Sequence, residues 1–258
     1  MISSSLLHVD REGAVAVLTM SDAGKRNALS SEMMRALIAA LDEVGAQRSI
    51  RAVVLRGEGP AFSAGHDLRE LGAASRDETQ GVFDLCVTLM ERLQSIEQPT
   101  IAEVDGVATA AGCQLVASCD LAVASTRSTF ATPGVKIGLF CSTPMVALTR
   151  AVGRKRAMEM LLLGEPIDAA TALAWGLLNR VVEPERVHDE ALAFAARIAV
   201  SARATVALGK AAFYEQIERP QREAYAFTKG VMVENARAAD AVEGIGAFLE
   251  KRKARWES

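Results

Sequence analysis

Apolar residues form short runs in the first half of this chain and helically spaced stripes in the second half. The runs that predict strands are 6–9, 15–20, 52–55, 101–104, 121–124 and 129–131, and 181–182 is a further short candidate. Glu12-Gly13, between the first two runs, indicates a hairpin. Because these strands alternate with helical segments, the pattern predicts an α/β protein.

Helical spacing marks most of the remaining chain. The expected helices are one between Ser30 and Gly45, then 111–119, 154–163, 168–175, 184–200, 205–217, 221–235 and 241–252. A polar stretch, 72–79, predicts a mobile loop, and the helix after it should end at Pro99. We expect a soft boundary near Ser201, between an α/β core at 1–200 and an all-helical C-terminal region at 201–258.

Two segments, 61–68 and 110–115, each follow an apolar run and pass through a small-residue turn before a predicted helix. Such a turn leaves backbone N–H groups without partners at one point, and small residues let a ligand approach them. Two turns that face each other can therefore hold the oxygen of a polarised carbonyl. The polar side chain after the second turn is Gln114, an amide that neither supplies nor removes a proton near neutral pH.

Composition narrows the class of protein. The 258 residues carry a net charge of −3, which argues against nucleic acid as the main partner. The cysteines form no C-x-x-C pair and the three histidines no H-x-x-x-H pair, so buried thiols are expected and a metal site is not. Residues 1–5 lack a basic segment and no long apolar run follows, which predicts no signal peptide, no membrane span and a cytoplasmic location.

The chain resembles the crotonase superfamily, the enoyl-CoA hydratase and isomerase fold, over essentially its whole length. The motifs that carry the resemblance are 26–29, 62–68, 106–120, 130–133, 172–177 and 246–253, in this order. The runs 108–120 and 138–144 further indicate one branch, the enoyl-CoA hydratase domain-containing type. The resemblance implies a spiral of ββα repeats with an acyl-CoA site, a C-terminal trimerisation region, and a homotrimer or a hexamer built as a dimer of trimers.

The resemblance also implies roles for individual residues. The backbone N–H groups of His66 and Ala111 would form an oxyanion hole for the thioester oxygen of an acyl-CoA, which is substrate or ligand; no covalently bound cofactor is implied. Donors of this kind stabilise an enolate-like intermediate by about 3 kcal/mol each. The residues that would hold coenzyme A are Lys25, Arg26, Ala28, Ala64, His66, Asp67 and Leu68, with Arg69 a further phosphate contact. Phe248 and Lys251 of a neighbouring subunit would close the site.

Two positions depart from the hydratases of this superfamily. Gln114 and Gly134 stand where the resemblance implies two catalytic glutamates. Hydration needs one group that deprotonates water and another that protonates the α-carbon, so ordinary hydratase activity is not expected. Gln114 would either act in catalysis by orienting water or serve as a buried amide between helix and loop, and the sequence leaves both roles open.

Other residues have a functional and a structural interpretation. For His66, the pattern favours the backbone N–H over the imidazole as the functional group. For Cys141, packing is favoured over a nucleophile, and Glu103 and Asp105 are expected to be structural partners. The basic residues after Lys251 would either clamp a phosphate or suit the end of a helix, and both remain open.

Three functions are consistent with these residues. The first is an acyl-CoA enzyme of the lyase or isomerase class with altered chemistry: isomerisation, thioester hydrolysis or decarboxylation. The second is a non-catalytic acyl-CoA-binding protein or assembly partner. The third is a weak hydratase in which Gln114 and water replace the missing glutamates.

Overall fold

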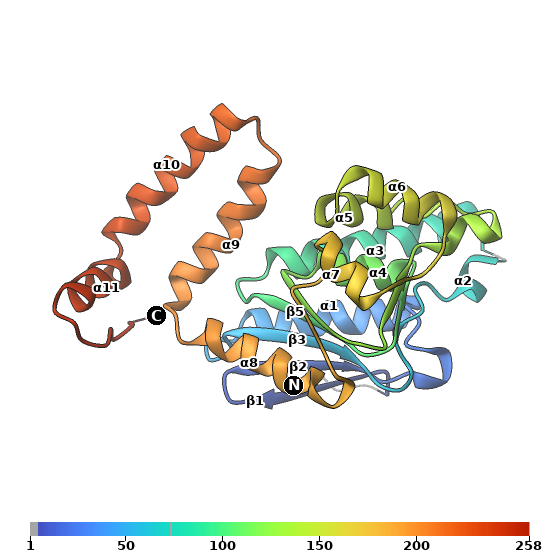
Figure 1. Ribbon diagram of the computed structural model, residues 1–258, viewed down its shortest axis with the longest axis horizontal. Helices are drawn as coiled ribbons and strands as arrows, with labels where there is room; N and C mark the ends of the chain where they lie inside the picture. The colour runs from blue at the N-terminus through green and yellow to red at the C-terminus, as the bar shows by residue number, and fades with distance from the viewer. Residues whose placement is uncertain (1–4, 73, 258) are drawn as a thin grey trace.

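Two sheets and the helices around them form the body of the molecule, and three C-terminal helices extend from it to one side (Figure 1). The computed structural model describes residues 5–72 and 74–257. The larger sheet has the order β1-β2-β3-β5-β7-β10. Its strands are β1 (Leu7–Glu12), β2 (Val15–Met20), β3 (Ala52–Gly57), β5 (Thr100–Val104), β7 (Leu121–Ser125) and β10 (Arg180–Val182).

The larger sheet is parallel except at its first pair. β1 and β2 are antiparallel and turn at Gly13, whose φ of 62° suits a hairpin, as Glu12-Gly13 predicted. The pairs β2–β3, β3–β5, β5–β7 and β7–β10 are parallel. The carboxyl ends of the central strands therefore lie at one edge, where the turns that follow them come together.

A second, smaller sheet has the order β4-β6-β8-β9. Its strands are β4 (Ala61–Ser63), β6 (Val107–Thr109), β8 (Thr129–Ala131) and β9 (Ile167–Asp168). Only β8 was predicted; in strands of two or three residues, β8 included, the period is too weak to be a dependable signal. A strand of the larger sheet precedes β4, β6 and β8 in turn, and helices follow each pair, which confirms the spiral of ββα repeats.

Helices cover both faces of the larger sheet. They are α1 (Ser31–Gly45), α2 (Leu68–Gly72), α3 (Arg76–Ser95), α4 (Ala111–Ser118), α5 (Pro144–Ala151), α6 (Arg154–Leu163), α7 (Ala169–Trp175) and α8 (Val187–Ala199). Leu18 and Leu55 point into the main core with α1, α3 and α4. Val17 and Val54 point to the other face, where they pack with Val187 of α8. Alternate strand residues thus serve two apolar layers, as the pleat requires.

The expected mobile loop at 72–79 was wrong over most of its length. α3 already begins at Arg76, and Ser75 and Glu78 form a capping box in which each side chain bonds the other's backbone N–H. Polar residues here satisfy the first turn of a helix and do not mark a loop. Residue 73 lies outside the described residues.

The chain changes direction near Ser201, where the boundary was expected. The helical segments Pro184–Ala199 and Arg203–Ile217 meet at an angle of 105°. The extension consists of α9 (Arg203–Ile217), α10 (Gln221–Arg237) and α11 (Ala239–Leu249). Lys210 of α9 ties it to the body through Asp120, with Nζ 2.7 Å from the carboxylate. The division into a core and an oligomerisation region stays a prediction.

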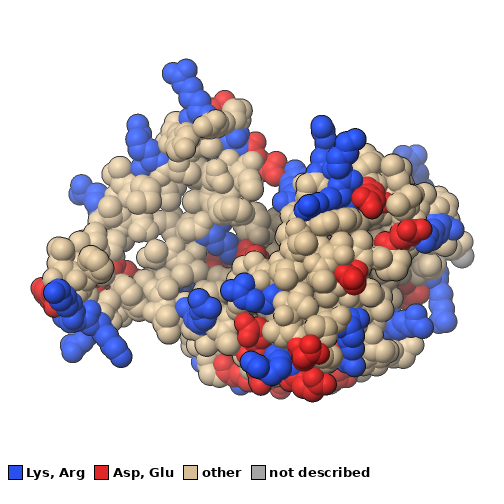
Figure 2. Space-filling view, viewed as in Figure 1, with Lys and Arg blue, Asp and Glu red and all other residues tan. Residues whose placement is uncertain are grey.

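In the space-filling view, blue and red side chains are interspersed over the body, whereas a broad area of α9 and α10 carries few charges (Figure 2). The exposed apolar side chains of α10 and α11 include Tyr225, Met232, Val233, Val242, Ile245 and Phe248. Within the described part of the chain, no single helix is long and apolar enough to cross a membrane; only the bent pair at Ser201 meets that test jointly.

Candidate active site

A cavity of about 880 Å³ opens where the turns after β4 and β6 meet. We call residues 63–66 the first turn and residues 109–111 the second turn. The residues that line the cavity are Gly24, Lys25, Ala28, Ala64, His66, Asp67, Leu68, Arg69, Leu71, Phe83, 109–111, Pro133, Gly134, 136–143 and Pro144. Both turns of the predicted carbonyl site therefore face one space.

The second turn has an unusual backbone. Ala110 has φ 53° and ψ −120°, a region that side chains with a Cβ rarely adopt, and Ala111 follows as the first residue of the buried helix α4. The N–H of a first helical residue has no partner in its own helix, and the helix dipole adds positive character there. Among the described residues we find no acceptor for the Ala111 N–H.

The first turn contacts the second directly. Gly65 has φ 84°, and a Cβ built on it would lie 2.8 Å from the Thr109 carbonyl oxygen and 3.0 Å from the Ala111 nitrogen. Only glycine permits this approach. Within the described ranges, the N–H of His66, the next residue, also lacks an acceptor. His66 and Ala111 therefore both line the cavity beside the close approach of the two turns. The oxyanion hole that the resemblance implied for their N–H groups stays a prediction.

The imidazole of His66 does not open toward the cavity. Both ring nitrogens are buried, and neither completes a hydrogen bond of normal geometry with the described residues. The ring packs edge-on against Phe83 with centroids 5.4 Å apart. Burial lowers the pKa of His66, while the nearby Leu29 carbonyl and Glu70 carboxylate act in the opposite direction. The ring is therefore neutral, which favours a functional role through the backbone.

Gln114 does not line the cavity. Its side chain is 4 % exposed, and its Oε1 lies 3.8 Å from the Cys86 thiol of α3, which donates to it. This position supports the interpretation as a buried amide between helices. A catalytic role of Gln114 in orienting water stays a prediction.

Most of the residues proposed to hold coenzyme A line the cavity, with Arg26 as the exception. Lys25, Ala28, Ala64, Asp67, Leu68 and Arg69 all face it. Arg26 contributes its carbonyl, which accepts the Ala64 N–H at 2.9 Å. The Lys25 ammonium lies 3.7 Å from the Asp67 carboxylate, so the only carboxylate among the lining residues already has a cationic partner.

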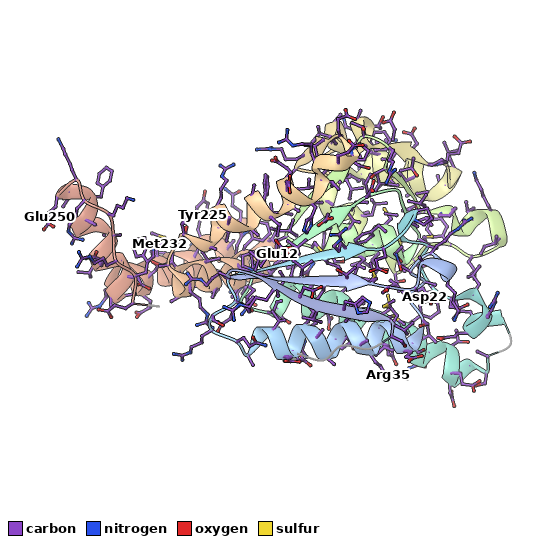
Figure 3. The ribbon with its side chains drawn as sticks, turned by 90° about the horizontal axis from the view of Figure 1, so that it is seen from below. Glu12, Asp22, Arg35, Tyr225, Met232 and Glu250 are labelled. Atoms are coloured by element: carbon purple, nitrogen blue, oxygen red, sulfur yellow. The ribbon has the colours of Figure 1, made fainter. Side chains whose placement is uncertain are left out.

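Phe248 and Lys251 lie far from this cavity in their own chain. Figure 3 places Asp22, next to the lining segment, at one end of the molecule and Glu250 at the other. Phe248 is 82 % exposed, and α11 ends at Leu249 because Lys251 has φ 56°. These two residues can therefore reach a cavity only in a second copy of the chain.

Gly134 and Cys141 line the cavity and pack against each other. The Gly134 N–H donates to the Cys141 sulfur at 3.4 Å. A Cβ on Gly134 would lie 2.9 Å from that sulfur and 2.5 Å from the Leu139 carbonyl oxygen. Burial raises the pKa of Cys141, so its thiol stays protonated, which supports a packing role over a nucleophile.

The sequence missed the apolar wall formed by 137–140. Ile137, Leu139 and Phe140 are exposed large apolar residues on the cavity. Ile137 ends a 3-10 helix, Pro133–Ile137, and Leu139 and Phe140 follow it; the three have no periodic spacing, so pattern analysis could not assign them. The sequence signal that could have pointed to this wall was Gly138, a glycine that permits a turn. In the structure its φ of 78° turns the chain back toward Gly134.

Glu103 and Asp105 have structural partners away from the cavity. Glu103 is 2 % exposed, with Arg56 Nε at 3.4 Å and His188 Nδ1 at 2.8 Å from its carboxylate. Asp105 accepts from Arg127 Nε at 2.7 Å. Both observations support the structural interpretation. Across residues 5–72 and 74–257, no three His, Cys, Asp or Glu side chains are placed to hold a metal ion.

Comparisons with known proteins identify the family. The sequence pattern of the enoyl-CoA hydratase/isomerase family matches residues 10–258. Enoyl-CoA hydratase domain-containing protein 3, mitochondrial, of Danio rerio is 48% identical over 257 residues, covering 99% of this chain and 89% of the relative. This relative confirms the branch that the runs 108–120 and 138–144 indicated.

Two solved structures share the fold. An enoyl-CoA hydratase of Mycobacterium smegmatis has a TM-score of 0.95 at 48% identity, covering 98% of this chain and 99% of that one. Human enoyl coenzyme A hydratase domain-containing protein 3 has a TM-score of 0.95 at 46% identity, covering 97% and 100%. The α/β class and the all-helical C-terminal end are thereby confirmed.

The expected cytoplasmic location was wrong. The similar relatives from zebrafish, rat, mouse and human are all named mitochondrial. The expectation rested on the composition of residues 1–5, but a targeting segment is read by a receptor and leaves no trace in the fold.

The family pattern over nearly the whole chain, together with relatives near half identity, shows that this chain belongs to the enoyl-CoA hydratase/isomerase family of the crotonase superfamily.

Proposed function

We propose that this chain binds acyl-CoA thioesters and stabilises an enolate-like form of the thioester at the N–H groups of His66 and Ala111. The observation that carries the proposal is the close approach of the two turns, in which a Cβ on Gly65 would lie 3.0 Å from the Ala111 nitrogen. The N–H groups of Ala111 and of His66, the residue after Gly65, have no acceptor among the described residues. Two fixed donors aimed at one oxygen stabilise the charge that develops there as the enolate forms.

The charges of the lining suit a coenzyme A thioester. Lys25, Arg69 and Lys136 face the cavity and can meet phosphates. The wall formed by Ile137, Leu139 and Phe140 is apolar and suits an acyl chain. Asp67, paired with Lys25, adds no free negative charge.

The same lining limits the chemistry. Hydration needs an acid and a base, yet the lining offers no unpaired carboxylate, and the Cys141 thiol is held protonated by burial. Decarboxylation needs the least proton transfer from the protein, because departure of CO₂ leaves its electron pair as the enolate. Isomerisation and thioester hydrolysis would need a proton carrier or a positioned water, so we place them after decarboxylation.

A second candidate is a non-catalytic acyl-CoA-binding protein or assembly partner. The position of Gln114 favours it, since this side chain is turned toward Cys86 and leaves the cavity without the expected polar group. Under this proposal the two N–H groups bind the thioester oxygen without any bond being made or broken.

We further propose a homotrimer or a dimer of trimers in which Phe248 and Lys251 close the cavity of a neighbouring subunit. Their exposure in the single chain and the apolar surface of α10 and α11 support this assembly. Apolar patches of this kind are typical of protein contacts. Arg252 pairs with Glu243, so part of the basic cluster serves the helix end.

The deciding experiment measures turnover of 3-enoyl-CoA, malonyl-type and crotonyl thioesters, with coenzyme A binding followed by calorimetry on the same sample. Turnover that disappears in Ala111→Pro supports the enzyme. Tight binding without turnover of any thioester in a broad panel moves the conclusion to the binding protein. Absence of both contradicts the whole proposal.

A weak hydratase is tested by Gln114→Glu combined with Gly134→Glu. We expect no gain in crotonyl-CoA hydration and a loss of about 1–3 kcal/mol in the free energy of unfolding, because a Cβ at 134 overlaps the Leu139 carbonyl. Thermal unfolding and a hydration assay measure the two effects. A folded double variant that hydrates crotonyl-CoA would show that the wall at 134–141 can adapt.

A further inference from the structure

Asn27 is a fully buried amide that spans the gap between two segments of the site. It is 0 % exposed, and its Nδ2 donates to the carbonyl oxygens of Glu58 at 2.9 Å and Ala61 at 2.8 Å. Its Oδ1 accepts the Asp22 N–H at 2.9 Å. Nearly all the hydrogen-bonding capacity of this amide is thus used, as burial requires.

The backbone of Asn27 is also tied to the first turn. Its carbonyl accepts from the Ser63 hydroxyl at 2.8 Å, and that hydroxyl accepts the Gly65 N–H at 3.2 Å. On either side of Asn27, the Arg26 carbonyl accepts the Ala64 N–H and the Leu29 N–H donates to the Gly65 carbonyl. The segment 26–29 and the first turn are therefore held together as one unit.

This unit ends at the N–H groups of the proposed oxyanion hole. Leu29 pairs with His66 in an isolated bridge, and Gly65 contacts the Ala111 nitrogen. A displacement of the segment 26–29 would therefore move the His66 N–H relative to the Ala111 N–H. Misplacement by about 1 Å costs roughly 10²-fold in catalysed rate, so such a unit can decide whether two donors reach one oxygen.

The residue type at 27 fits this task closely. Its φ of 51° lies in the left-handed region, which asparagine adopts more readily than most residues. Aspartate would adopt the same backbone but would place a carboxylate against the Glu58 and Ala61 oxygens. Gly57 leaves the space for the amide, since a Cβ there would lie 2.6 Å from Asn27 Nδ2.

We propose that Asn27 is a positioning residue that aims the His66 N–H, through Ser63 and the first turn, at the thioester oxygen shared with Ala111. This inference takes its ligand, the thioester, from the proposed function on which it rests. It takes its geometry from the hydrogen bonds around Asn27. Lys25 and Ala28, on either side of this unit's Arg26 and Asn27, line the cavity, so the part that would meet coenzyme A and the part that would meet the carbonyl move together.

The test compares Asn27→Asp with Gln98→Glu. Gln98 is a buried amide that donates to the Val44 carbonyl at 3.2 Å and does not line the cavity, so both variants turn a buried amide into an acid facing backbone oxygens. The probe is 4-dimethylaminocinnamoyl-CoA, whose absorption band moves to longer wavelength when its carbonyl is polarised. We expect both variants to lose thermal stability, but only Asn27→Asp to lose more than half of the spectral shift while still binding the probe.

Amide hydrogen exchange on the unliganded protein gives a second measurement. We expect the Ala64 and Gly65 amides to exchange at least about tenfold faster in Asn27→Asp than in wild type or Gln98→Glu, since their acceptors move. Ser63→Ala, which removes the hydroxyl between Asn27 and Gly65, should show the same changes to a smaller degree and serves if Asn27→Asp does not fold.

The failures of the two proposals are distinguishable. A wild type that binds no probe, or binds it without a spectral shift, contradicts the proposed function, and the exchange measurement then decides the role of Asn27 alone. A full spectral shift with unchanged exchange in Asn27→Asp, or in Ser63→Ala if the first variant is unfolded, overturns the positioning role.

Discussion

The first and second turns face the same cavity with one unpaired N–H each, but different interactions hold them. The first turn is fixed by a polar network: the Ser63 hydroxyl accepts the Gly65 N–H and donates to the Asn27 carbonyl. Only the short helix α2 follows this turn. The second turn is held by the Ala110 N–H, which donates to the Ala131 carbonyl at 2.9 Å, and by burial of α4, and these interactions outweigh the backbone strain at Ala110. The first N–H therefore depends on a side-chain hydroxyl, and the second depends on a backbone hydrogen bond and on packing.

This difference separates what each turn contributes. A polar network can be loosened by one isosteric substitution, whereas a buried helix start can be changed only by removing its N–H or altering its backbone. Substitutions in the two turns should therefore fail in different ways, although both donors serve one oxygen in the proposed function.

The largest expected effect comes from removing the second donor. Ala111→Pro eliminates the N–H at the first helical position, where proline is tolerated, and turnover should fall about 10²–10³-fold. Proline disfavours the backbone of the residue before it, so Ala110→Gly is included in both the variant and its control. Turnover of the active thioester, or the spectral shift of the bound cinnamoyl probe, measures the loss. An unchanged value would show that the Ala111 N–H does not contact the oxygen.

The next largest effect is expected from a substitution that pushes the two turns apart. Gly65→Ala places a Cβ 2.9 Å from the Ala110 Cβ at a φ of 84°, and we expect a loss of about 2 kcal/mol or more in the free energy of unfolding. Gly72→Ala is the matched control, because a Cβ at the end of α2 meets nothing within 4 Å. Denaturant unfolding at a fixed protein concentration compares them. Equal stability of the two variants would contradict the close contact of the turns.

A smaller effect, a gain in stability, should follow from relieving the backbone strain of the second turn. Ala110→Gly removes the cost of a Cβ at φ 53°, and after the extra entropy of glycine we expect about 0.5–1 kcal/mol of added stability. The same unfolding measurement applies. A destabilised variant would mean that the Ala110 methyl contributes more by packing than its backbone costs.

The smallest effect is a pH dependence confined to the first turn, which alone carries a histidine. Burial lowers the pKa of His66 below 6.5, so the folded chain favours the neutral ring and stability should fall as pH drops below 6.5. His66→Gln keeps the backbone N–H and should flatten that part of the profile.

His188 acts in the opposite direction and serves as the control. Burial alone would lower its pKa, but Glu103 and Glu12 raise it overall, so its contribution is present below 6.5 and is lost as pH rises through the raised value. His188→Gln should flatten the alkaline side only. Melting temperatures from about pH 5 to about pH 8 test both. Wild-type profiles in both variants would show that neither ring changes its protonation on unfolding.

Particular elements show which parts of the fold could be predicted from the sequence and which could not. The periodic residues of α1, the run that became β2 and the start of α4 at Ala111 were predicted because each is decided by residues close together in the chain. β4, β6 and β9 were missed because two or three residues acquire strand structure only by pairing with distant neighbours. The loop expected at 72–79 failed because polarity alone does not distinguish a helix cap from a loop.

The candidate site divides in the same way. The two turns were identified from their small residues, whereas His66 and Ala111 were assigned by the family resemblance, and their roles stay predictions. The orientation of Gln114 toward Cys86 and the packing of Gly134 against Cys141 could not be read from the sequence, because both depend on side chains that meet across separate elements.

By itself, the sequence determined the family, the order of the larger sheet's strands and of the longer helices, and the two small-residue turns, since these depend on local spacing and on motifs. The tertiary structure alone decided that Gly65 meets Ala111, that Asn27 reaches Ala61, and that Gly134 has no room for a side chain. The physical reason is distance along the chain: contacts between remote segments form only when the sheets close and bury them, and a local pattern carries no record of which remote atoms will meet.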